Sequence, residues 1–591
     1  MNIRLNIIFL IILSVVAILL SRVYFLSIKS NTYYEELSKN NYISRVHKLP
    51  IRGMIEDRNG EKLAINEMGF SLLIKPHLSS NKNKERLEEV ADLIIKYFPE
   101  YEKEKIIKEY KKEDSSYNHD FIKVIDYIPY DSFFPKYTIF SSNDFIKIEP
   151  STRRYYPQKE VASHIIGYVG KATKLDILGN ELSQFNGVIG KNGLEKFYNS
   201  KLQGEMGYKD VKVNALNQEI EILEEKDASV DNSIKTTLDV RLQKYIQEVF
   251  EGKSGAIVVM DARNGELLAA ASFPEYDNNI FSKGITVNEW NDMKNNFDHP
   301  FTNKIINGLY PPGSVIKMGV ALSFLENGIK DNFTVNCTGS LTIGDRNFRC
   351  WKTTGHGLVD VRKAIAESCD DFFYKGSLKL GIGKISETLA KLGIGELTGV
   401  DQINEFAGVN PNKEWKESKF NQPWYIGETV ITSIGQGNML VSPLQIARYT
   451  AFLATGRLPK PHFYKANYEE PKDLDIPKEY LEIVRKGMYD VAYDERGTAN
   501  KYVNSKVTIA AKTGTAQVVT ISQSEKVRMK ESELKYYDRS HAWITSFAPF
   551  KNPQFIVTVL EEHGGHGGAA GEIISKIYDK LLELGYIVQE K

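Results

Sequence analysis

Three short motifs hold residues whose types and spacing could do chemistry. Ser314 and Lys317 lie three residues apart at the start of an apolar run, so on a helix they would share a face, with Cβ atoms about 5–6 Å apart. A hydroxyl and an amine at that separation can act as nucleophile and base. Spacing alone does not single out this pair, because two similar Ser-x-x-Lys matches lie in charge-rich stretches typical of solvated loops: Ser79/Lys82 and Ser532/Lys535.

The residues around Ser314 favour the start of a buried helix. Tyr310-Pro311-Pro312-Gly313 interrupts regular structure, and serine is a favoured residue at a helix start. The apolar run that follows ends at Asn327-Gly328, a favourable helix C-terminus. We therefore expect Ser314 at the mouth of a buried helix, with Lys317 one turn further on.

Two more motifs follow along the chain. Ser368-Cys369-Asp370 continues a helical pattern that begins at Val361. Lys512-Thr513-Gly514-Thr515 comes directly after a strand expected at residues 507–511; Gly514 would let a ligand approach the backbone, and Lys512 offers a cation. Each motif alone is weak. Ser-x-x-Lys, Ser-x-Asp and Lys-Thr-Gly-Thr in this order are the signature of penicillin-binding proteins and serine β-lactamases.

The resemblance extends over nearly the whole chain. An apolar N-terminus, the stretch 52–64 and residues 190–195 are similar to class B high-molecular-weight penicillin-binding proteins. Cys350-Trp351-Lys352 and Gly355-His356-Gly357, with Ser-x-Asp in place of Ser-x-Asn, most resemble the elongation-type members of that family. The resemblance implies a D,D-transpeptidase that cross-links peptidoglycan stem peptides ending in D-Ala-D-Ala and that is acylated by β-lactams.

The resemblance also implies catalytic roles. Ser314 would attack the carbonyl of the penultimate D-Ala, Lys317 would take the hydroxyl proton, and Ser368 would relay a proton to the leaving amine near Lys512. Lys317 must be neutral to act as a base, and burial together with the charge of Lys512 would favour that form. An acceptor amine from a neighbouring strand would then resolve the acyl-enzyme. This chemistry needs no cofactor.

Further residues would bind the substrate. Thr513 and Thr515 would hold the terminal carboxylate together with the second lysine, on a strand that Gly514 leaves open. By family analogy the backbone N–H groups of Ser314 and Thr515 would form the oxyanion hole. Asp370 stands where asparagine is more common. Asparagine both donates and accepts hydrogen bonds, whereas an ionised aspartate only accepts, so Asp370 would contact the substrate's peptide amide as an acceptor.

The N-terminus predicts a membrane anchor. Residues 5–21 carry no charge and are mostly Ile, Leu, Val and Ala, which is near the minimum for a membrane span; Arg22 or residues 23–26 would lengthen it. The apolar core does not run into a small-x-small cleavage site, so we expect an uncleaved single-pass anchor. The flanking charges do not fix its orientation. The resemblance implies the cytoplasmic (inner) membrane, with the catalytic domain in the periplasm.

Length and composition bound the fold. The chain has 591 residues, so several domains are expected. Its 76 Lys and Arg balance its 76 Asp and Glu, so no excess of positive charge indicates a nucleic-acid partner. Strands at both ends of the C-terminal part, with helices between them, favour an antiparallel sheet packed against a helical lobe. We expect an α+β protein with a cytoplasmic tail and transmembrane helix at 1–28, an elongated mixed α/β pedestal of the dimerisation type at 29–235, and a transpeptidase domain at 236–591.

Local patterns place the main elements. Asn59-Gly60 favours a hairpin turn, and Pro99 should interrupt a helical stretch. The remaining predicted elements are helices within 82–114, a hairpin at 254–272, helices at 361–380 and 442–453, strands at 542–547 and 554–561, and a closing amphipathic helix near 573–584.

The three cysteines of the chain, Cys337, Cys350 and Cys369, are close in sequence and have His356 among them. Cys₃His is a common ligand set for a closed structural zinc site, and elongation-type relatives resemble this in carrying a metal beside the active site. A disulfide plus one buried thiol is the alternative, because the implied compartment is oxidising. We predict zinc that braces the second motif. The run 563–568, with two histidines among glycines, predicts a flexible loop beside the substrate cleft.

Other functions share some of these features. A serine β-lactamase would hydrolyse the antibiotic and needs neither anchor nor pedestal, and a penicillin-sensing receptor usually has several spans and a protease domain. A catalytically weak scaffold of the elongation complex would not be acylated. Labelled penicillin separates these cases. The partners that the resemblance implies are a polytopic glycosyltransferase and proteins of the elongation complex.

Overall fold

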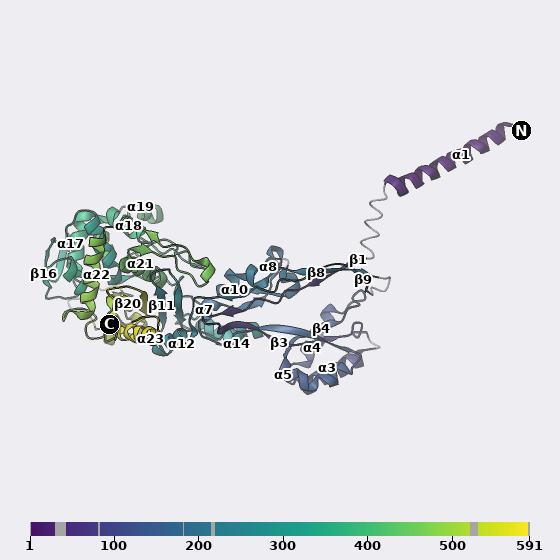
Figure 1. Cartoon of the computed structure of the whole chain (residues 1–591), viewed down its shortest axis with the longest axis horizontal. Coiled ribbons are helices and arrows are strands. Elements are labelled where there is room, and N and C mark those ends of the chain that lie inside the picture. Colours follow the sequence, from purple (N-terminus) through teal and green to yellow (C-terminus); the bar gives the residue numbers. More distant parts are fainter. Residues whose placement is uncertain are drawn as a thin grey trace. The chain divides into compact units, whose positions relative to one another are not determined.

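The structure, a computed structural model, describes residues 2–29, 43–80, 83–180, 182–213, 219–519 and 530–588. The chain divides into two compact units. One unit comprises Met1–Gly53, Ala172–Gly187 and Ser200–Asn232, and the other comprises Met54–Lys171, Val188–Asn199 and Ser233–Lys591. Figure 1 labels the helices and strands of both units.

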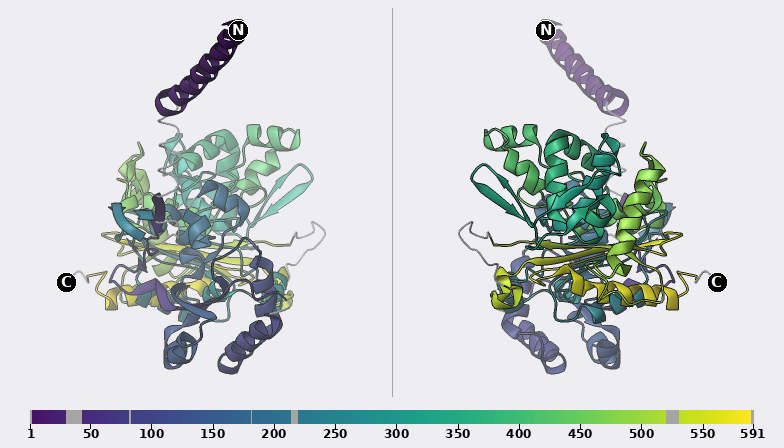
Figure 2. Two further views of the ribbon diagram at one scale, coloured as in Figure 1. Left: turned by 90° about the vertical axis from the view of Figure 1, so that its right-hand side faces the viewer. Right: turned by 90° about the vertical axis from the view of Figure 1, so that its left-hand side faces the viewer.

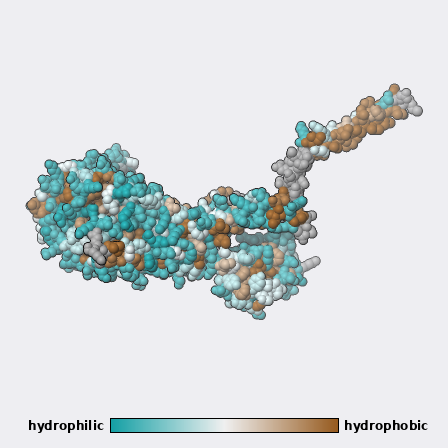
Figure 3. Space-filling view, viewed as in Figure 1, coloured by the Kyte–Doolittle hydropathy of each residue, from teal (hydrophilic) through white to brown (hydrophobic). Residues whose placement is uncertain are grey.

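The first unit contains an apolar N-terminal helix. Helix α1 spans Asn2–Tyr24 and continues into a π-helical turn at Phe25–Lys29. Residues Ile3–Lys29 are long and apolar enough to cross a membrane, and no side chain in the most apolar part is buried in the protein (Figure 3). Within the described ranges no other helix meets this criterion. The helix is longer than the predicted apolar core of residues 5–21, because it begins at Asn2 and continues through the π-helical turn to Lys29.

The rest of the first unit is a small antiparallel sheet with short helices. Its strand order is β1-β8-β9, and Arg45 faces Asp210 in register, with Nη2 and Oδ2 2.6 Å apart. Its elements are β1 (Ile43–Lys48), α8 (Lys174–Gly179), α9 (Leu182–Asn186), β8 (Gly207–Val213) and β9 (Glu219–Lys226).

The second unit begins with a pedestal sheet. The predicted Asn-Gly hairpin is confirmed: Gly60 has φ +95°, and Asp57 accepts hydrogen bonds from the backbone of Asn59 and Glu61. The helices interrupted at Pro99 are also confirmed; Lys82, where that prediction began, lies outside the described residues. The elements are β2 (Ile55–Glu56), β3 (Lys62–Ile74), α3 (Lys84–Tyr97), α4 (Lys103–Glu113), β4 (Ile122–Pro129), β5 (Ile146–Tyr155) and β10 (Ile234–Lys235).

A five-stranded antiparallel sheet forms the centre of the C-terminal part, in the order β12-β11-β21-β20-β19. Helices α12 and α23 pack on one face and α21 on the other, so the strands lie between two helical layers (Figure 2). This confirms the predicted α+β architecture. The elements are α12 (Val240–Val249), β11 (Gly255–Asp261), β12 (Leu267–Phe273), α21 (Pro443–Thr455), β19 (Ala510–Ala516), β20 (His541–Ala548), β21 (Phe555–Glu561) and α23 (Gly571–Glu583).

The helical lobe carries the remaining segments that border the site. They include the 3-10 turn η3 (Gly313–Ile316), α15 (Lys317–Glu326), β13 (Val335–Cys337), β14 (Ser340–Ile343), β15 (Arg346–Arg349), β16 (Gly357–Val359), α16 (Val361–Ala366), α17 (Asp370–Leu380), α18 (Ile382–Lys391), α19 (Lys413–Phe420), α20 (Ile426–Thr432) and α22 (Lys478–Tyr493).

Two predicted elements differ in the structure. The pattern from Val361 to Leu380 is not one helix: it breaks at Ser368, whose φ of +54° lies in the left-handed region that most side chains avoid. The last motif does not follow its strand but forms it, because β19 begins at Ala510. The backbone N–H of Ile509 donates instead to the Tyr493 hydroxyl, at 3.0 Å, and so stays outside the strand ladder.

Candidate active site and Cys/His cluster

The half-buried Ser314 lies in the short turn η3, held between two other segments. Gly313 has φ +55°, and its N–H donates to the carbonyl of Gly435 at 2.8 Å. A Cβ at position 313 would lie 2.7 Å from the carbonyl oxygen of Thr515, so only glycine fits here. The turn that carries Ser314 therefore packs directly against strand β19 of the third motif.

Lys317 begins helix α15 and is fully buried. Its Nζ lies 2.6 Å from Oδ1 of Asp370, 2.9 Å from the carbonyl oxygen of Ser368 and 3.2 Å from the Ser368 hydroxyl. The structure thus brings the first two motifs together. It also pairs the amine with a carboxylate, which sequence analysis did not expect.

The hydroxyl of Ser368 joins the second motif to the third. Lys512 is also fully buried, and its Nζ lies 3.0 Å from Ser368 Oγ and 3.0 Å from the carbonyl oxygen of Thr513. One hydroxyl therefore contacts two lysine amines. This arrangement is a continuous path for a proton between Lys317 and Lys512.

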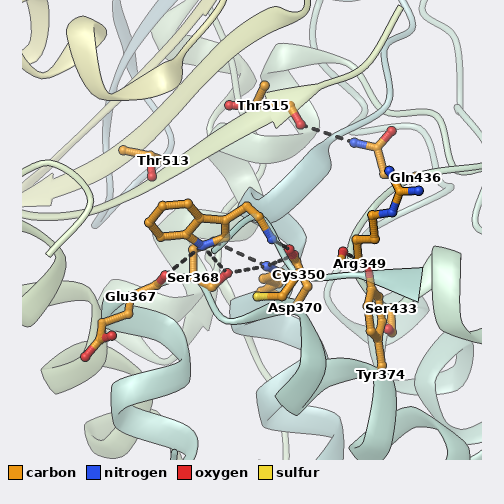
Figure 4. A network of polar contacts seen from close by, with 12 residues as sticks. Arg349, Cys350, Glu367, Ser368, Asp370, Tyr374, Ser433, Gln436, Thr513 and Thr515 are labelled. Carbon is orange, nitrogen blue, oxygen red and sulfur yellow. Dashed lines mark hydrogen bonds and ion pairs between the residues drawn. The ribbon is translucent and has the colours of Figure 1, made fainter. Parts of the chain in front are cut away.

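Strand β19 borders the site with the rest of the third motif. Thr513 shares a hydrogen bond of 2.6 Å with the Thr498 hydroxyl, and the carbonyl of Thr515 accepts one from Gln436 Nε2 at 3.2 Å. Figure 4 shows Thr513 and Thr515 on their strand in the upper part of the view and Ser368 below them, within the network. A Cβ at Gly514 would lie 3.1 Å from the Pro312 carbonyl oxygen, so this glycine allows the strand to approach the Ser314 turn closely.

Burial acts on the charged groups of the site in opposite directions. Burial, together with the nearby charge of Lys317, holds the pKa of Lys512 well below its usual 10.5. Burial raises the pKa of Asp370, although the neighbouring Lys317 ammonium opposes the shift. Burial and an adjacent cation, the two causes that sequence analysis expected to depress a lysine pKa, therefore act together on Lys512.

The four predicted metal ligands form one buried cluster. The sulfur atoms of Cys337 and Cys350 each lie 3.5 Å from His356 Nδ1, and the donor atoms of all four residues, Cys369 included, lie within 4.8 Å of one another. All three cysteines are free, so the structure contains no Cys337–Cys350 disulfide. A tetrahedral zinc with bonds of about 2.3 Å to sulfur and 2.0–2.1 Å to nitrogen separates such ligands by about 3.6 Å. The residues present fit that group.

The glycine-rich run lies beside the third motif, and its last residues begin the 3-10 turn η7 (Gly567–Ala570). Its flexibility and its contact with the substrate cleft stay predictions. A Cβ at Gly567 would lie 2.3 Å from the carbonyl oxygens of Gly514 and Trp543. His563 packs on His541, with ring centroids 4.8 Å apart, and the backbone N–H of His563 donates to His541 Nδ1 at 3.1 Å. Of the described residues, only the cysteine cluster has three or more side chains placed for a metal, so these histidines do not form such a group.

Comparison with known protein families identifies the chain. The family model described as penicillin binding protein transpeptidase domain matches residues 255–582, and the one described as penicillin-binding protein dimerisation domain matches residues 47–236. The first alone covers more than half of the sequence. The chain belongs to the class B penicillin-binding proteins. The family inferred from the three motifs is thus confirmed.

The relatives of this penicillin-binding protein include peptidoglycan D,D-transpeptidases and penicillin-binding proteins 2. The peptidoglycan D,D-transpeptidase MrdA of Escherichia coli K12 is 34% identical, over 97% of this chain and 93% of that protein. Penicillin-binding protein 2 of Helicobacter pylori, solved in complex with MreC, is 45% identical with a TM-score of 0.86, over 92% of this chain and 99% of that one. A chain of a peptidoglycan synthase complex that coordinates polymerization and crosslinking is 25% identical, with a TM-score of 0.69, over 100% of this chain and 99% of that one.

Sequence reasoning missed several residues that shape this penicillin-binding protein's site. Gly435, Gln436 and Thr498 contact the first and third motifs, and the backbone N–H of Trp351 donates to Asp370 Oδ2 at 2.9 Å. The spacing of Gly435 and Gly437 was a usable signal, because paired glycines often mark close backbone contacts. Trp351 had been noted only as part of the family likeness.

Proposed function

We propose that this transpeptidase cross-links peptidoglycan stem peptides during cell-wall elongation through an acyl intermediate on Ser314, and that β-lactams acylate the same oxygen. One observation carries the proposal: the Ser368 hydroxyl contacts both Lys317 and Lys512, at 3.2 and 3.0 Å, directly beside the strand on which the Ser314 turn packs. The arrangement supplies a nucleophile, a base and a proton path to a leaving group.

The starting state of the proposed mechanism is the ion pair between Lys317 and Asp370. Lys317 is paired with the Asp370 carboxylate at 2.6 Å, whereas burial favours the neutral form of Lys512. A proton that moves from Lys317 through the Ser368 hydroxyl to Lys512 leaves a neutral amine at 317 to deprotonate Ser314. The same shift makes Lys512 a cation when the substrate's carboxylate arrives, and that carboxylate stabilises it.

Bond formation then follows from the assigned roles. Ser314 Oγ attacks the carbonyl of the penultimate D-Ala, its proton passes to Lys317, and the oxyanion is stabilised by the N–H groups of Ser314 and Thr515. The C–N bond to the terminal D-Ala breaks as its nitrogen receives a proton by way of Ser368. An amine of a second stem peptide attacks the ester and regenerates the Ser314 hydroxyl, so the reaction balances without a cofactor.

Substrate binding is proposed along strand β19. Lys512, Thr513 and Thr515 hold the terminal carboxylate, and Gly514 keeps the strand open to the peptide. Both oxygens of Asp370 already accept hydrogen bonds, from Lys317 and from the Trp351 N–H. We therefore infer that Asp370 first positions Lys317; its contact with the substrate amide remains a prediction.

A structural zinc is proposed for the Cys/His cluster. Cys337, Cys350, Cys369 and His356 would hold it, and the support is the free state of the thiols and their spacing. When bound, the ion would supply folding energy and no chemistry of the reaction. Cys369 lies between Ser368 and Asp370, so the cluster would fix the second motif at its middle residue.

The proposed location and assembly follow the helix and the relatives. Helix α1 would anchor the chain as a single pass in the cytoplasmic membrane, with the catalytic part in the periplasm. The proposed domains are 1–28, 29–235 and 236–591. The second boundary is supported by the family models, because the dimerisation-domain model ends at residue 236 and the transpeptidase-domain model begins at residue 255. The related complex of penicillin-binding protein 2 with MreC supports a partner of the MreC type, and the related peptidoglycan synthase complex supports a polymerising glycosyltransferase.

Mass spectrometry of the intact protein after treatment with penicillin tests the proposed function. The wild type should gain the mass of one penicillin and keep it, and Ser314→Ala should gain none and should form no cross-links with peptidoglycan precursors. Ser532→Ala is the matched control, because the exposed Ser532 begins another Ser-x-x-Lys match and should be dispensable. Rapid loss of the adduct would favour a β-lactamase, and no adduct on the wild type would favour a scaffold.

A further inference from the structure

Trp351 touches the second motif at both of its ends. Its backbone N–H donates to Asp370 Oδ2 at 2.9 Å. Its indole Nε1–H lies 3.0 Å from the carbonyl oxygen of Glu367 and 3.1 Å from that of Ser368. The two donors therefore bracket the turn that carries the Ser368 hydroxyl.

That turn needs support from outside, because its backbone is strained. Ser368 has φ +54°, and a non-glycine residue in this region persists only where its surroundings hold it. The Ser368 carbonyl, which accepts from the indole, also accepts from Lys317 Nζ at 2.9 Å. Any shift of this carbonyl would thus move the contact between the serine and the lysine.

The indole itself is held from its other side. Trp351 follows Cys350 directly, and its ring meets the His356 ring edge to face, with centroids 5.4 Å apart. Trp351 as a whole residue nevertheless remains 54% exposed, far more than a core tryptophan. An aromatic ring that loses so little surface to the core contributes modestly through burial, so its polar contacts are the more informative feature.

We infer that Trp351 is a positioning residue of the transpeptidase reaction: its two N–H groups hold the strained turn at Ser368 so that the serine hydroxyl stays between Lys317 and Lys512. The inference rests on the proposed acylation of Ser314. Its hydrogen bonds go to Glu367, Ser368 and Asp370, so it acts on the reaction through Ser368 and Asp370.

The test compares full-length variants in detergent by stopped-flow acylation with a fluorescent penicillin, which separates the binding constant K from the acylation rate constant k2. Trp351→Phe keeps a ring against His356 but lacks the indole donor. Incorporation of benzothienylalanine at position 351 keeps the full size of the side chain and replaces only N–H by sulfur. Both variants should lower k2 about 10-fold or more, as expected for a lost hydrogen bond and a relaxed turn, and should change K less than about 3-fold.

Trp424→Phe is the matched control. It also loses an indole hydrogen bond, to the Thr429 hydroxyl at 2.9 Å, and should keep the wild-type k2. Hydrogen exchange at the amides of residues 367–370 should be faster in both Trp351 variants and unchanged in the control. Wild-type k2 and exchange in the benzothienylalanine variant would overturn the inference, and an equal fall of k2 in Trp424→Phe would do so as well. A wild type that takes up no penicillin would instead refute the proposed function.

Discussion

Lys317 and Asp370 form a buried ion pair within the catalytic site, with Nζ and Oδ1 2.6 Å apart and the lysine side chain fully enclosed. Removing one partner of such a pair leaves an uncompensated buried charge, which costs about 3–5 kcal/mol. The acid of the second motif therefore holds the amine of the first motif in place. This link is independent of any contact between Asp370 and substrate.

The first prediction concerns Asp370→Asn, which introduces the residue more common at this position. Both oxygens of Asp370 accept from donors, Lys317 and the Trp351 N–H, but an asparagine amide has one oxygen and one NH₂ group. The NH₂ group of the asparagine would then face either the Lys317 amine or the Trp351 N–H, so that two donors would meet without an acceptor. We expect k2/K for acylation to fall about 10- to 100-fold, the equivalent of one lost charge-assisted hydrogen bond of about 1.5–3 kcal/mol.

Asp345→Asn is the control for this substitution, since Asp345 is exposed in the turn between β14 and β15. It should acylate at the wild-type rate. If Asp370→Asn also acylates at the wild-type rate, the ion pair does not position Lys317, and a direct contact between residue 370 and the substrate becomes the better explanation.

The second prediction follows from the lowered pKa of Lys512. In the unfolded chain this pKa returns to about 10.5, so at pH values between the folded and unfolded pKa unfolding takes up a proton. The stability of the wild type should therefore rise with pH in this window and fall as the pH drops. Lys512→Met cannot bind the proton. From pH 8 to 10 the unfolding free energy of the wild type should rise relative to Lys512→Met by up to about 1.4 kcal/mol per pH unit.

Urea unfolding of the detergent-solubilised protein, followed by tryptophan fluorescence at several pH values, measures this difference. Lys486→Met is the control, because the Lys486 side chain is 55% exposed. Its unfolding free energy should run parallel to that of the wild type. Parallel curves for Lys512→Met would mean that Lys512 keeps an ordinary proton affinity in the folded state, and the proposed proton path from Lys317 would lose its acceptor.

Most of the fold could be predicted because its patterns are local. The Asn59-Gly60 hairpin, the break at Pro99 and the helix that ends at Asn327-Gly328 each depend on residues whose backbone preferences are strong. The three motifs predicted one site because their order in the chain matched a known family. Their mutual distances depended on the tertiary fold, which brings residues far apart in sequence together at Ser368.

The conformation of Ser368 could not be predicted, since the helical pattern runs through it without a glycine. The turn exists because its carbonyl binds Lys317 and the Trp351 indole, two groups outside the pattern. The pairing of Lys317 with Asp370 could not be predicted either, because it also depends on contacts between distant parts of the chain. Sequence analysis assigned Asp370 to the substrate, because nothing in the local sequence shows that α15 and α17 place the two side chains 2.6 Å apart.

The third prediction concerns Gly435, which sequence analysis did not select. Its φ is +70°, and a Cβ there would lie 2.3 Å from the carbonyl oxygen of Gly313, the residue before Ser314. Gly435→Ala should therefore displace the nucleophile turn as well as strain its own backbone. We expect k2/K to fall at least 10-fold in the acylation assay.

Gly344→Ala separates the clash from the strain. Gly344 has a similar φ of +61° but nothing within 4 Å of its Cβ position, so the substitution should cost some thermal stability and leave acylation unchanged. Equal loss of acylation in both variants would show that backbone strain alone, rather than contact with the Ser314 turn, accounts for the effect.

The fourth prediction concerns the proposed zinc. Plasma mass spectrometry of the purified protein should find about one zinc per chain, and Cys337→Ser should lower that content; Cys337 is the ligand to replace because it lies in β13, outside the second motif. Removal of the metal with a strong chelator should lower Tm by several degrees, and zinc, but not magnesium, should restore it, because thiolate and imidazole ligands prefer zinc.

His566→Ala is the control for metal content, since His566 belongs to the glycine-rich run and not to the cluster. Its zinc content should equal that of the wild type. If the cluster supports the second motif through Cys369, the acylation rate of Cys337→Ser should fall together with its zinc content. A protein without metal and with a Cys337–Cys350 disulfide would overturn the zinc proposal, because the same two sulfur atoms cannot serve both bonds.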